Sequence, residues 1–322
     1  MKRMFAIAAS LAVSSLPAHG ADTFPSHPVT FVVPFPPGGG VDPVARLVGT
    51  KLAEKWGQPV IVNNRPGASG NIGSDLVARA APDGHTLLVT TNGFLINPHV
   101  LSPANKARAD AMADFKPVAM LSTTPLVALV HPSVPARNLA DLAALARKEP
   151  GLLFAGSGNG SPMHMAGELF KKAAGVSMTY SPYRGIGLAM NDVLGGHVKV
   201  IFVGLAGGKA QIDSGRLVPL ATLESRRTPL LPDVPTAEEQ GFPGTLMDAW
   251  FGMYGPRDLP PGLVARINED VNTVLKDPAV AKQLAEMSQA PEPMNPSAFA
   301  AKVKADYDRY GRIIRDAHIQ PE

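Results

Sequence analysis

Short apolar runs alternate with stretches of helical periodicity along most of this chain. Residues 31–33, Phe-Val-Val, form an apolar run of the kind found in strands that are covered on both faces of a sheet. Apolar residues then recur at helical spacing between positions 44 and 52, and Gly57 follows as a helix stop signal. The pattern predicts a strand, a connecting loop over residues 34–40 and a helix.

The alternation continues after this first helix. Residues 59–62 and 86–90 are typical of two further strands, and residues 71–80 between them carry the apolar spacing of a helix. Strands that alternate with helices form a parallel sheet with right-handed crossovers. Ligands of such sheets bind beyond the carboxyl ends of the strands, so we expect residues 38–42 and 90–93 to share one rim.

A second unit repeats this order later in the chain. Residues 152–155 predict a strand, residues 156–161 a glycine-rich loop, and Pro162 the start of a helix. An extended aromatic segment follows at residues 246–254, and the C-terminal part is helical. The fold class is therefore α/β, and two Rossmann-like units suggest two lobes that face one another across a cleft.

Composition supports a globular protein with more than one domain. The chain has 322 residues, of which 45% are hydrophobic and 18% are charged, so a sizeable core is expected. The formal charge is +3, and it falls to +1 once Lys2 and Arg3 are removed. A balance so close to neutral gives no support to nucleic-acid binding.

The N-terminus predicts export. Lys2 and Arg3 precede an apolar run over residues 4–16, and Ala18 and Gly20 supply the small residues of a cleavage site. Residues 1–20 are therefore expected to be a signal peptide that is cleaved after Gly20. A transmembrane anchor is the alternative, but thirteen apolar residues are too few to span a bilayer.

The chain contains no cysteine, which excludes disulfides, thiolate metal sites, a cysteine nucleophile and a lipid-modified N-terminal cysteine. An exported chain without a lipid anchor or a membrane span is expected to lie in the periplasm of a Gram-negative cell.

Both glycine loops lead into helix starts, a pattern that favours anion binding. The three glycines at 38–40 have no side chains, so a ligand can approach the backbone directly. Asp42 is a good N-cap, and Pro43 suits the first helical turn. Free N–H groups and the positive end of the helix dipole then attract an anion. The alternative is a tight strand-to-helix turn that binds nothing.

An enzyme is the competing class. The GxSxG, HExxH and GxxxxGK patterns are missing, and no pair of histidines has metal-ligand spacing. We expect no catalytic residues, no metal and no cofactor. A secreted serine hydrolase that uses Ser157 or Ser161 with His164 stays open as an alternative.

Five motifs stand in the order and spacing of one known family. They are Pro34-Phe-Pro-Pro-Gly-Gly-Gly-Val-Asp-Pro-Val-Ala-Arg46, Asn64-Arg-Pro-Gly-Ala-Ser-Gly-Asn-Ile-Gly73, Ala81-Pro-Asp-Gly84, Pro182-Tyr-Arg-Gly185 and Leu231-Pro-Asp-Val-Pro-Thr236. The chain resembles the substrate-binding receptors of tripartite tricarboxylate transporters, the Bug-type receptors, over the whole mature sequence. The resemblance includes residues 250–256 and the C-terminal helices.

The resemblance implies a type II-like, two-lobed periplasmic binding protein of the Venus flytrap kind, joined by two crossing strands near residues 118–129 and 246–254. Lobe 1 is expected at residues 22–122 with 247–322, and lobe 2 at residues 123–246. Such receptors are monomers that bind small carboxylates through backbone N–H groups and waters, and deliver them to the transporter's membrane subunits. Some also report their bound state to sensor proteins, which is a second alternative.

The expected ligand contacts follow the two loops and the neighbouring strand ends. They are Phe35, Pro37, Gly38, Gly39, Gly40, Val41, Asp42, Thr91, Asn92, Gly156, Ser157, Gly158, Asn159, Gly160, Ser161, His164, Tyr183, Arg184, Val203 and Trp250. For His164, a buried structural role is as good an explanation as a ligand contact. For Arg184, a solvated position on the surface is an equally good explanation.

Two departures from the family pattern bear on the ligand. Val41 stands where the family often has Thr or Ser, and Val203-Gly204 stands where a polar pair is frequent. Unpaired polar groups in a closed cleft cost roughly 1–3 kcal/mol each, so these apolar residues favour a less polar mono- or dicarboxylate over citrate.

Overall fold

The computed structural model describes residues 24–101, 109–183, 185–316 and 319. The expected signal peptide and Arg184 lie outside the described residues. Within these ranges, no helix combines the length and the apolar character needed to cross a membrane.

Ten strands form one continuous sheet in the order β2-β1-β3-β9-β4-β7-β5-β6, with β8 and β10 paired to β4 beside this path. Their bounds are β1 Val29–Val33, β2 Val60–Asn64, β3 Thr86–Thr91, β4 Phe115–Val130, β5 Leu152–Ser157, β6 Met178–Tyr183, β7 Val200–Gly204, β8 Val218–Thr222, β9 Asp248–Pro256 and β10 Ala290–Pro291.

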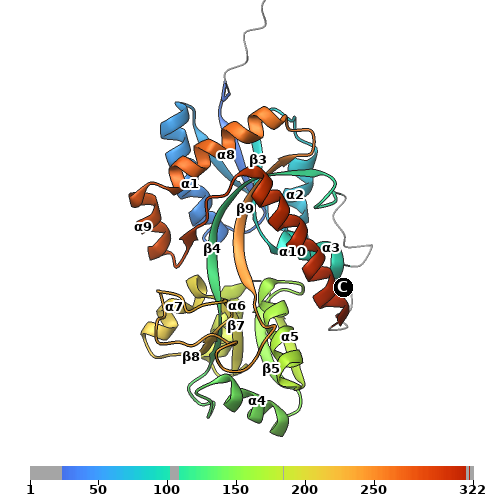
Figure 1. Cartoon of the computed structure of the whole chain (residues 1–322), viewed down its shortest axis with the longest axis vertical. Helices are drawn as coiled ribbons and strands as arrows, with labels where there is room; N and C mark the ends of the chain where they lie inside the picture. Colours follow the sequence, from blue (N-terminus) through green and yellow to red (C-terminus); the bar gives the residue numbers. More distant parts are fainter. Residues whose placement is uncertain (1–23, 102–108, 184, 317–318, 320–322) are drawn as a thin grey trace, which may run out of the picture.

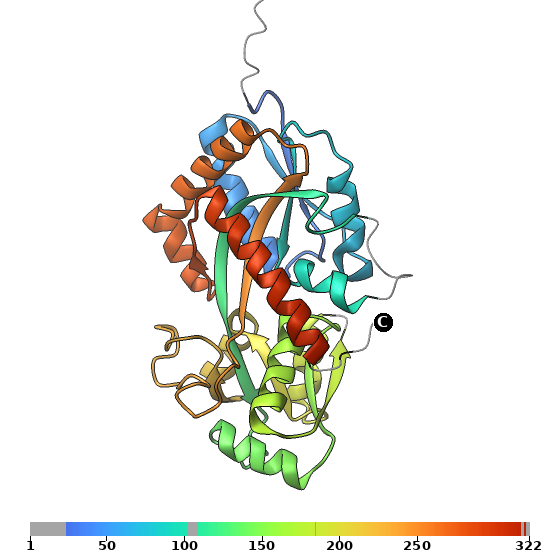
Figure 2. The same ribbon diagram turned by 45° about the vertical axis from the view of Figure 1, so that its right-hand side comes forward.

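Helices cover both faces of the sheet (Figures 1 and 2). They are α1 Val41–Trp56, the short 3-10 helix Ala68–Gly70, α2 Asn71–Ala78, α3 Gly93–Val100, α4 Leu139–Lys148, α5 Pro162–Ala174, α6 Ile186–Leu194, α7 Leu205–Asp213, α8 Pro261–Leu275, α9 Pro278–Glu286 and α10 Pro296–Asp316.

The chain forms two lobes (Figure 1). Lobe 1, the upper one, contains β1–β3, α1–α3, β9 and α8–α10, and lobe 2 contains β5–β8 and α4–α7. Strand β4 pairs with β9 along Phe115–Pro125 and with β7 from Leu126 to Val130, so it runs through both lobes. The predicted α/β fold with two lobes and two crossing strands is confirmed.

The first predicted unit forms because its apolar residues have two surfaces to bury. Every residue of β1 except Thr30 is fully buried, as a central parallel strand requires. Helix α1 packs Val44, Val48 and Leu52 onto that sheet. It ends at Gly57, whose φ of 66° is left-handed and whose N–H bonds the carbonyl of Ala53.

One buried apolar cluster is continuous between the lobes. It includes Leu95 and Tyr310 of lobe 1 together with Phe154 and Phe202 of lobe 2. Helix α10 crosses the boundary and its C-terminal end approaches α5 (Figures 1 and 2). The lobes therefore contact each other through packed side chains as well as through the two strands.

Candidate functional site

The carboxyl ends of the parallel strands of each lobe point toward the other lobe. In lobe 1, Thr91 at the end of β3 pairs with Phe251, close to the start of β9 at the lobe boundary. In lobe 2, Gly204 at the end of β7 pairs with Leu126, where β4 enters that lobe. The loops after β1, β3, β5 and β7 are thus placed between the lobes, where ligands of such sheets bind.

Two glycines show how closely the lobes approach at one end of this boundary. A Cβ atom added to Gly93 of lobe 1 would lie 3.7 Å from Cδ of Pro162 in lobe 2. A Cβ added to Gly160 would lie only 2.2 Å from Cγ2 of Val100 in α3. The β5–α5 loop therefore packs directly against α3.

Asp42, in the first turn of α1, stabilises the first glycine loop through a hydrogen bond to its backbone. Helix α1 begins at Val41, and its N-cap is Gly40, so the expectation that Asp42 caps the helix is corrected. The Asp42 carboxylate instead accepts the N–H of Gly38 at 3.0 Å and pairs with Arg46 at 2.9 Å. Burial alone would raise the pKa of Asp42, but hydrogen bonds from Arg46, Gly38 and Asn64 outweigh it and hold the pKa below its usual value.

This arrangement reduces the number of free donors in the first loop. The N–H of Gly38 is taken by Asp42, that of Gly39 by the carbonyl of Pro36 at 3.4 Å, and that of Asp42 by Gly39. Within the described residues, the N–H groups of Gly40 and Val41 have no protein acceptor. They are adjacent and open the helix, which suits one carboxylate group.

The second loop is held in a similar way by its neighbours. Gly158 and Gly160 have φ values of 78° and 66°, which favour glycine. The carbonyl of Gly158 accepts the hydroxyl of Tyr180, and the hydroxyl of Ser161 caps α5 by accepting the N–H of His164. The N–H groups of Gly158 and Asn159 have no protein acceptor in the described parts of the chain.

His164 is a structural residue of this loop in the conformation described. Its side chain is almost completely buried, its Nδ1 accepts the N–H of Gly160 at 3.2 Å, and its Nε2 lies 3.6 Å from the carboxylate of Glu168. Neither ring nitrogen is directed to Ser157, whose hydroxyl contacts the sulfur of Met163, or to the hydroxyl of Ser161. The geometry therefore gives no support to a serine hydrolase that uses His164 as its base.

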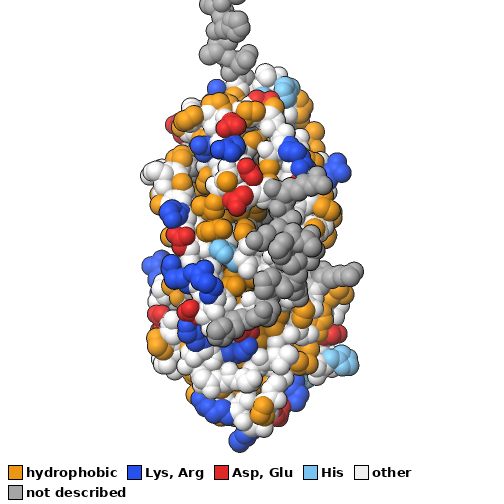
Figure 3. All heavy atoms as spheres, turned by 90° about the vertical axis from the view of Figure 1, so that its right-hand side faces the viewer, with side chains coloured by type: hydrophobic (Ala, Val, Ile, Leu, Met, Phe, Trp, Pro, Cys, Tyr) orange, Lys and Arg blue, Asp and Glu red, His pale blue; other side chains and the backbone are white. Residues whose placement is uncertain are grey.

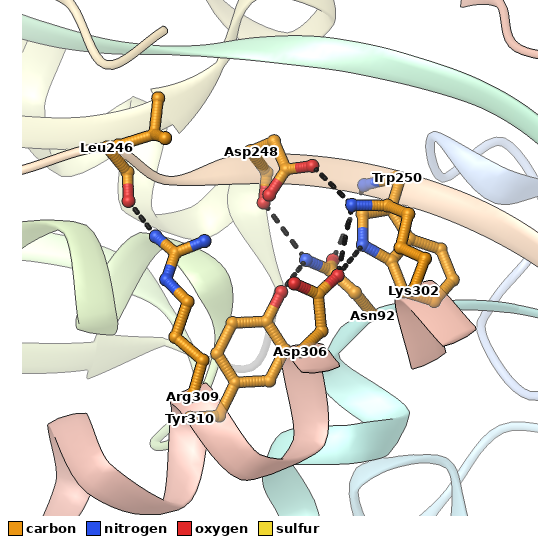
Figure 4. Close-up of polar contacts among 8 residues, drawn as sticks. All are labelled: Asn92, Leu246, Asp248, Trp250, Lys302, Asp306, Arg309 and Tyr310. Carbon is orange, nitrogen blue, oxygen red and sulfur yellow. Dashed lines mark hydrogen bonds and ion pairs between the residues drawn. The ribbon is translucent and has the colours of Figure 1, made fainter. Parts of the chain in front are cut away.

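Asn92 and Trp250 belong to a buried polar network between β9 and α10 (Figure 4). Both are fully buried; Asn92 donates to the hydroxyl of Tyr310 at 2.7 Å, and the Trp250 indole donates to Asp306 at 2.9 Å. Neither side chain offers surface to the space between the lobes, so both expected ligand contacts are corrected. Lys302 completes the network by bonding Asp306 at 3.0 Å.

Phe251, the next residue of β9, contacts the first glycine loop. Successive side chains of a strand point to opposite faces, so Trp250 faces α10 while Phe251 faces α1. A Cβ added to Gly40 would lie 3.3 Å from the Phe251 ring. Phe251 therefore supports the first glycine loop from the core side, a role that the sequence pattern did not reveal.

The remaining expected contacts are divided between the core and the boundary. Val203 is fully buried in the core of lobe 2, which removes it from an exposed wall. Tyr183 is half-buried and donates its hydroxyl to Asp192 at 2.6 Å; burial and this bond raise the pKa of Tyr183. Thr91 accepts the N–H of Gly93. Phe35 is half-buried and Pro37 is exposed, both beside the first loop.

A group of side chains with metal-ligand spacing lies elsewhere in the described chain. His27, Asp83 and His85 stand before β1 and β3, at the opposite strand ends from the glycine loops. The N–H of Ser26 donates to Nε2 of His85, which leaves the ring proton on Nδ1, 3.3 Å from Asp83. The group is therefore held by the Ser26 contact and by stacking of the His27 and His85 rings, whose centroids lie 3.6 Å apart.

A hollow of about 190 Å³ lies between α5 and α10, beside the lobe boundary and away from both glycine loops. Its charged lining is already paired in part, because Lys172 bonds Asp316 at 2.9 Å. Lysine and arginine side chains gather on the left of Figure 3, about halfway up the molecule. The hollow contains none of the expected ligand contacts.

A sequence model described as the tripartite tricarboxylate transporter family receptor matches residues 44–319. The chain belongs to this family. Among its relatives, the UPF0065 protein of the tcbD–tcbE intergenic region of a Pseudomonas strain is 36% identical over 310 residues, covering 96% of this chain and 91% of the relative. BugT of Bordetella pertussis is 34% identical over 297 residues, covering 92% and 91%.

Solved receptors share the whole architecture. Rpa4515 of R. palustris, determined with adipate, superposes with a TM-score of 0.86 at 33% identity, covering 93% of this chain and all of that one. MatC of Rhodopseudomonas palustris, determined with bound malate, gives a TM-score of 0.81 at 32% identity, covering 90% and 100%. The receptor family thus includes proteins that bind small carboxylates.

Proposed function

We propose that this chain is a periplasmic solute receptor that binds a small organic carboxylate between its lobes and delivers it to the membrane subunits of a tripartite tricarboxylate-type transporter. One observation carries the proposal: each lobe of a chain of this family places a glycine loop and a helix start at the lobe boundary. Each loop keeps adjacent N–H groups without a protein acceptor among the described residues.

The proposed contacts are the N–H groups of Gly40 and Val41 in lobe 1 and of Gly158 and Asn159 in lobe 2. One helix start in each lobe suits a ligand with a carboxylate at both ends. A ligand held by both lobes favours closure about β4 and β9, because only the closed form makes both sets of contacts. Asn159 adds a half-buried amide side chain that has no partner in the described chain.

The lobes are proposed to comprise residues 22–122 with 247–322 and residues 123–246. The exchange of β4 partners between Pro125 and Leu126 supports a boundary close to residue 123. The expected signal peptide supports export to the periplasm, and the receptor is proposed to act as a monomer. Adipate and malate, the ligands of two structural relatives, support an aliphatic dicarboxylate.

A thermal-shift screen of adipate, malate, citrate and benzoate, followed by calorimetric titration, tests the proposal. A ligand at ~100 times its dissociation constant stabilises the native state by about 2.7 kcal/mol. If no acid of this kind shifts the melting temperature, the proposed function is wrong. If citrate binds and adipate does not, the apolar character inferred from Val41 is wrong while the receptor function stands.

A matched pair of variants tests the site itself. Gly40 has φ −52° and ψ −33°, which a proline can adopt, so Gly40→Pro removes one N–H donor and keeps the φ of residue 40. Gly40→Ala adds a Cβ at the same place, 3.3 Å from Phe251, but keeps the donor. A hydrogen bond to a charged group contributes roughly 1.5–3 kcal/mol, so the proline variant should bind at least ~10-fold more weakly than the alanine variant. Equal affinities would show that this N–H does not bind the ligand.

A further inference from the structure

Two aromatic side chains of lobe 2 hold the glycine loop that is proposed to bind ligand. The rings of His164 and Tyr180 stack with their centroids 3.8 Å apart and their planes within 6°. The Tyr180 hydroxyl donates to the carbonyl of Gly158, and Nδ1 of His164 accepts the N–H of Gly160. The stacked pair therefore hydrogen-bonds the loop at Gly158 and Gly160, the residues on either side of Asn159.

The contact with Gly160 fixes which nitrogen of His164 carries the proton. An N–H can donate only to an unprotonated ring nitrogen, so Nδ1 is bare and the neutral ring carries its hydrogen on Nε2. Nε2 faces Glu168 at 3.6 Å. A second proton would have to go onto Nδ1, where it would point at the N–H of Gly160, and the hydrogen bond would be lost.

The charged groups nearest to His164 belong to α5 and α10. On its own helix, Glu168 favours the protonated ring, and Lys171 bonds the same carboxylate at 2.7 Å. Burial opposes ionisation of Glu168, but the bonds from His164 and Lys171 outweigh it and keep the pKa of Glu168 below its usual value. Strand β6 contributes Tyr180, whose hydroxyl bonds the loop, and α3 presents the apolar Ile96 and Val100 at Gly160. Helix α10 brings Arg309, Arg312 and Asp316 to the far side of Glu168.

The loop has little room to relax around a protonated ring. Gly160 is buried, and the space of a Cβ on it is already filled by Val100 and Ile96 of α3. Breaking the Gly160 contact therefore moves the loop against lobe 1 or away from it. Either movement displaces the N–H groups of Gly158 and Asn159, which precede Gly160 in the loop.

We propose that His164 is the positioning residue of the lobe 2 loop, and that protonation of its imidazole disorganises the loop and releases the carboxylate ligand. This inference rests on the proposed function, because it assigns a pH-dependent release to the same site.

The first test needs no ligand. In ¹H–¹⁵N spectra of the unliganded protein, the Gly160 amide resonance should move between pH 7.5 and 5.5 together with the His164 ring resonances. In His164→Asn, whose side-chain oxygen can accept the same N–H, the Gly160 resonance should not titrate. His197→Asn, the same change at an exposed histidine of lobe 2, should behave like the wild type. A Gly160 resonance that ignores pH in the wild-type protein overturns the proposal.

The second test is calorimetric titration with adipate, or with malate if adipate does not bind. Wild type and His197→Asn should lose at least fivefold in affinity from pH 7.5 to 5.5. His164→Asn in the same buffers should lose less than twofold, which also corrects for titration of the ligand. His164→Leu, which has no acceptor, should bind at least tenfold more weakly at pH 7.5. Equal pH profiles for wild type and His164→Asn overturn the proposal. If neither acid binds, the proposed ligand class is wrong, and the role of His164 is then decided by the spectra.

Discussion

The carboxylate of Asp42 accepts the N–H of Gly38 at 3.0 Å, four residues back along the chain. An acidic residue next to a proposed anion site would ordinarily repel its ligand. Here the charge is directed back into the loop, is paired with Arg46 and is almost fully buried. Asp42 therefore acts as a brace that shapes the loop, and the donors offered to a ligand are those of Gly40 and Val41.

Replacing Asp42 should separate this bracing role from the effect of its charge. Asp42→Ala removes the acceptor of the Gly38 N–H and should lower affinity for adipate by about tenfold, with a loss of stability of roughly 1–3 kcal/mol. Asp42→Asn keeps an oxygen acceptor and removes the charge, so its affinity should fall by no more than about threefold. Titration calorimetry and urea unfolding provide the two measurements. Wild-type binding by the alanine variant would contradict the bracing role.

Neighbouring residues of β9 should respond differently to substitution. Trp250→Phe keeps most of the buried ring but removes the donor to Asp306, so stability should fall by about 1–3 kcal/mol while ligand affinity changes less than twofold. Phe251→Ala removes the support of the Gly40 loop and should reduce both stability and affinity. If Trp250→Phe weakens binding as much as Phe251→Ala, the placement of the two rings relative to the site is wrong.

Two glycines of one loop allow backbone strain to be separated from contact between the lobes. Both have positive φ, but a Cβ on Gly158 meets nothing within 4 Å, whereas one on Gly160 meets Val100. Gly158→Ala should cost roughly 1–2 kcal/mol through strain alone, and Gly160→Ala should cost at least about 1 kcal/mol more. Adding Val100→Ala should relieve the clash of Gly160→Ala but not its strain. Equal unfolding free energies for the two single variants would contradict a tight contact between the loop and α3.

Lys302 holds two carboxylates in the network of Figure 4, those of Asp248 and Asp306, each at 3.0 Å. Burial lowers the pKa of Lys302, but the two carboxylates outweigh this effect and raise it above its usual value. A raised pKa of a lysine means that its ionic stabilisation is fully present at neutral pH and is lost as pH rises through the folded value.

Lys302→Met should leave the Asp306 carboxylate without its cation and reduce stability at pH 7.5 by roughly 2–4 kcal/mol. Burial already raises the pKa of Asp306, and loss of the lysine raises it further. The folded variant then binds a proton more readily than the unfolded chain, so part of the lost stability should return as the pH falls toward 5. Urea unfolding at several pH values measures this, and Lys304→Met, at an exposed ion pair of the same helix, is the control. A deficit that is independent of pH would contradict a charge-based role.

The sequence predicted the elements whose signals are local. The buried run of β1, the helical spacing of α1 and its stop at Gly57 each depend on a few neighbouring residues, and the structure contains all three. Helix α3 was missed because it contains Pro98 and is apolar on most sides, so its helical period is hidden. Helix α7 was missed because Gly207 and Gly208 weaken its intrinsic propensity, and packing against β4 and β7 stabilises it.

The individual contacts of the site were harder to predict than the loops that carry them. Both faces of β9 are covered, so the alternation of side chains could not show whether Trp250 or Phe251 faces the first loop. The role of Asp42 depended on a helix start at Val41, on Arg46 one turn further along the same helix, and on Asn64 at the end of β2. His164 was equally compatible with a ligand contact or a buried role, and only the position of Gly160 distinguishes the two in this conformation.

The insertion of β9 between β3 and β4 has a consequence for how the protein is made. Only residues 92–114 separate the end of β3 from the start of β4, yet β9 begins only at Asp248. A growing chain therefore carries two unpaired strand edges until the whole of lobe 2 has been synthesised. Lobe 2 can begin to fold before lobe 1 is complete, and a nascent chain that stops short of Pro256 cannot close its larger sheet. The edges of β3 and β4 in lobe 1 can therefore be joined only after β9 has been synthesised.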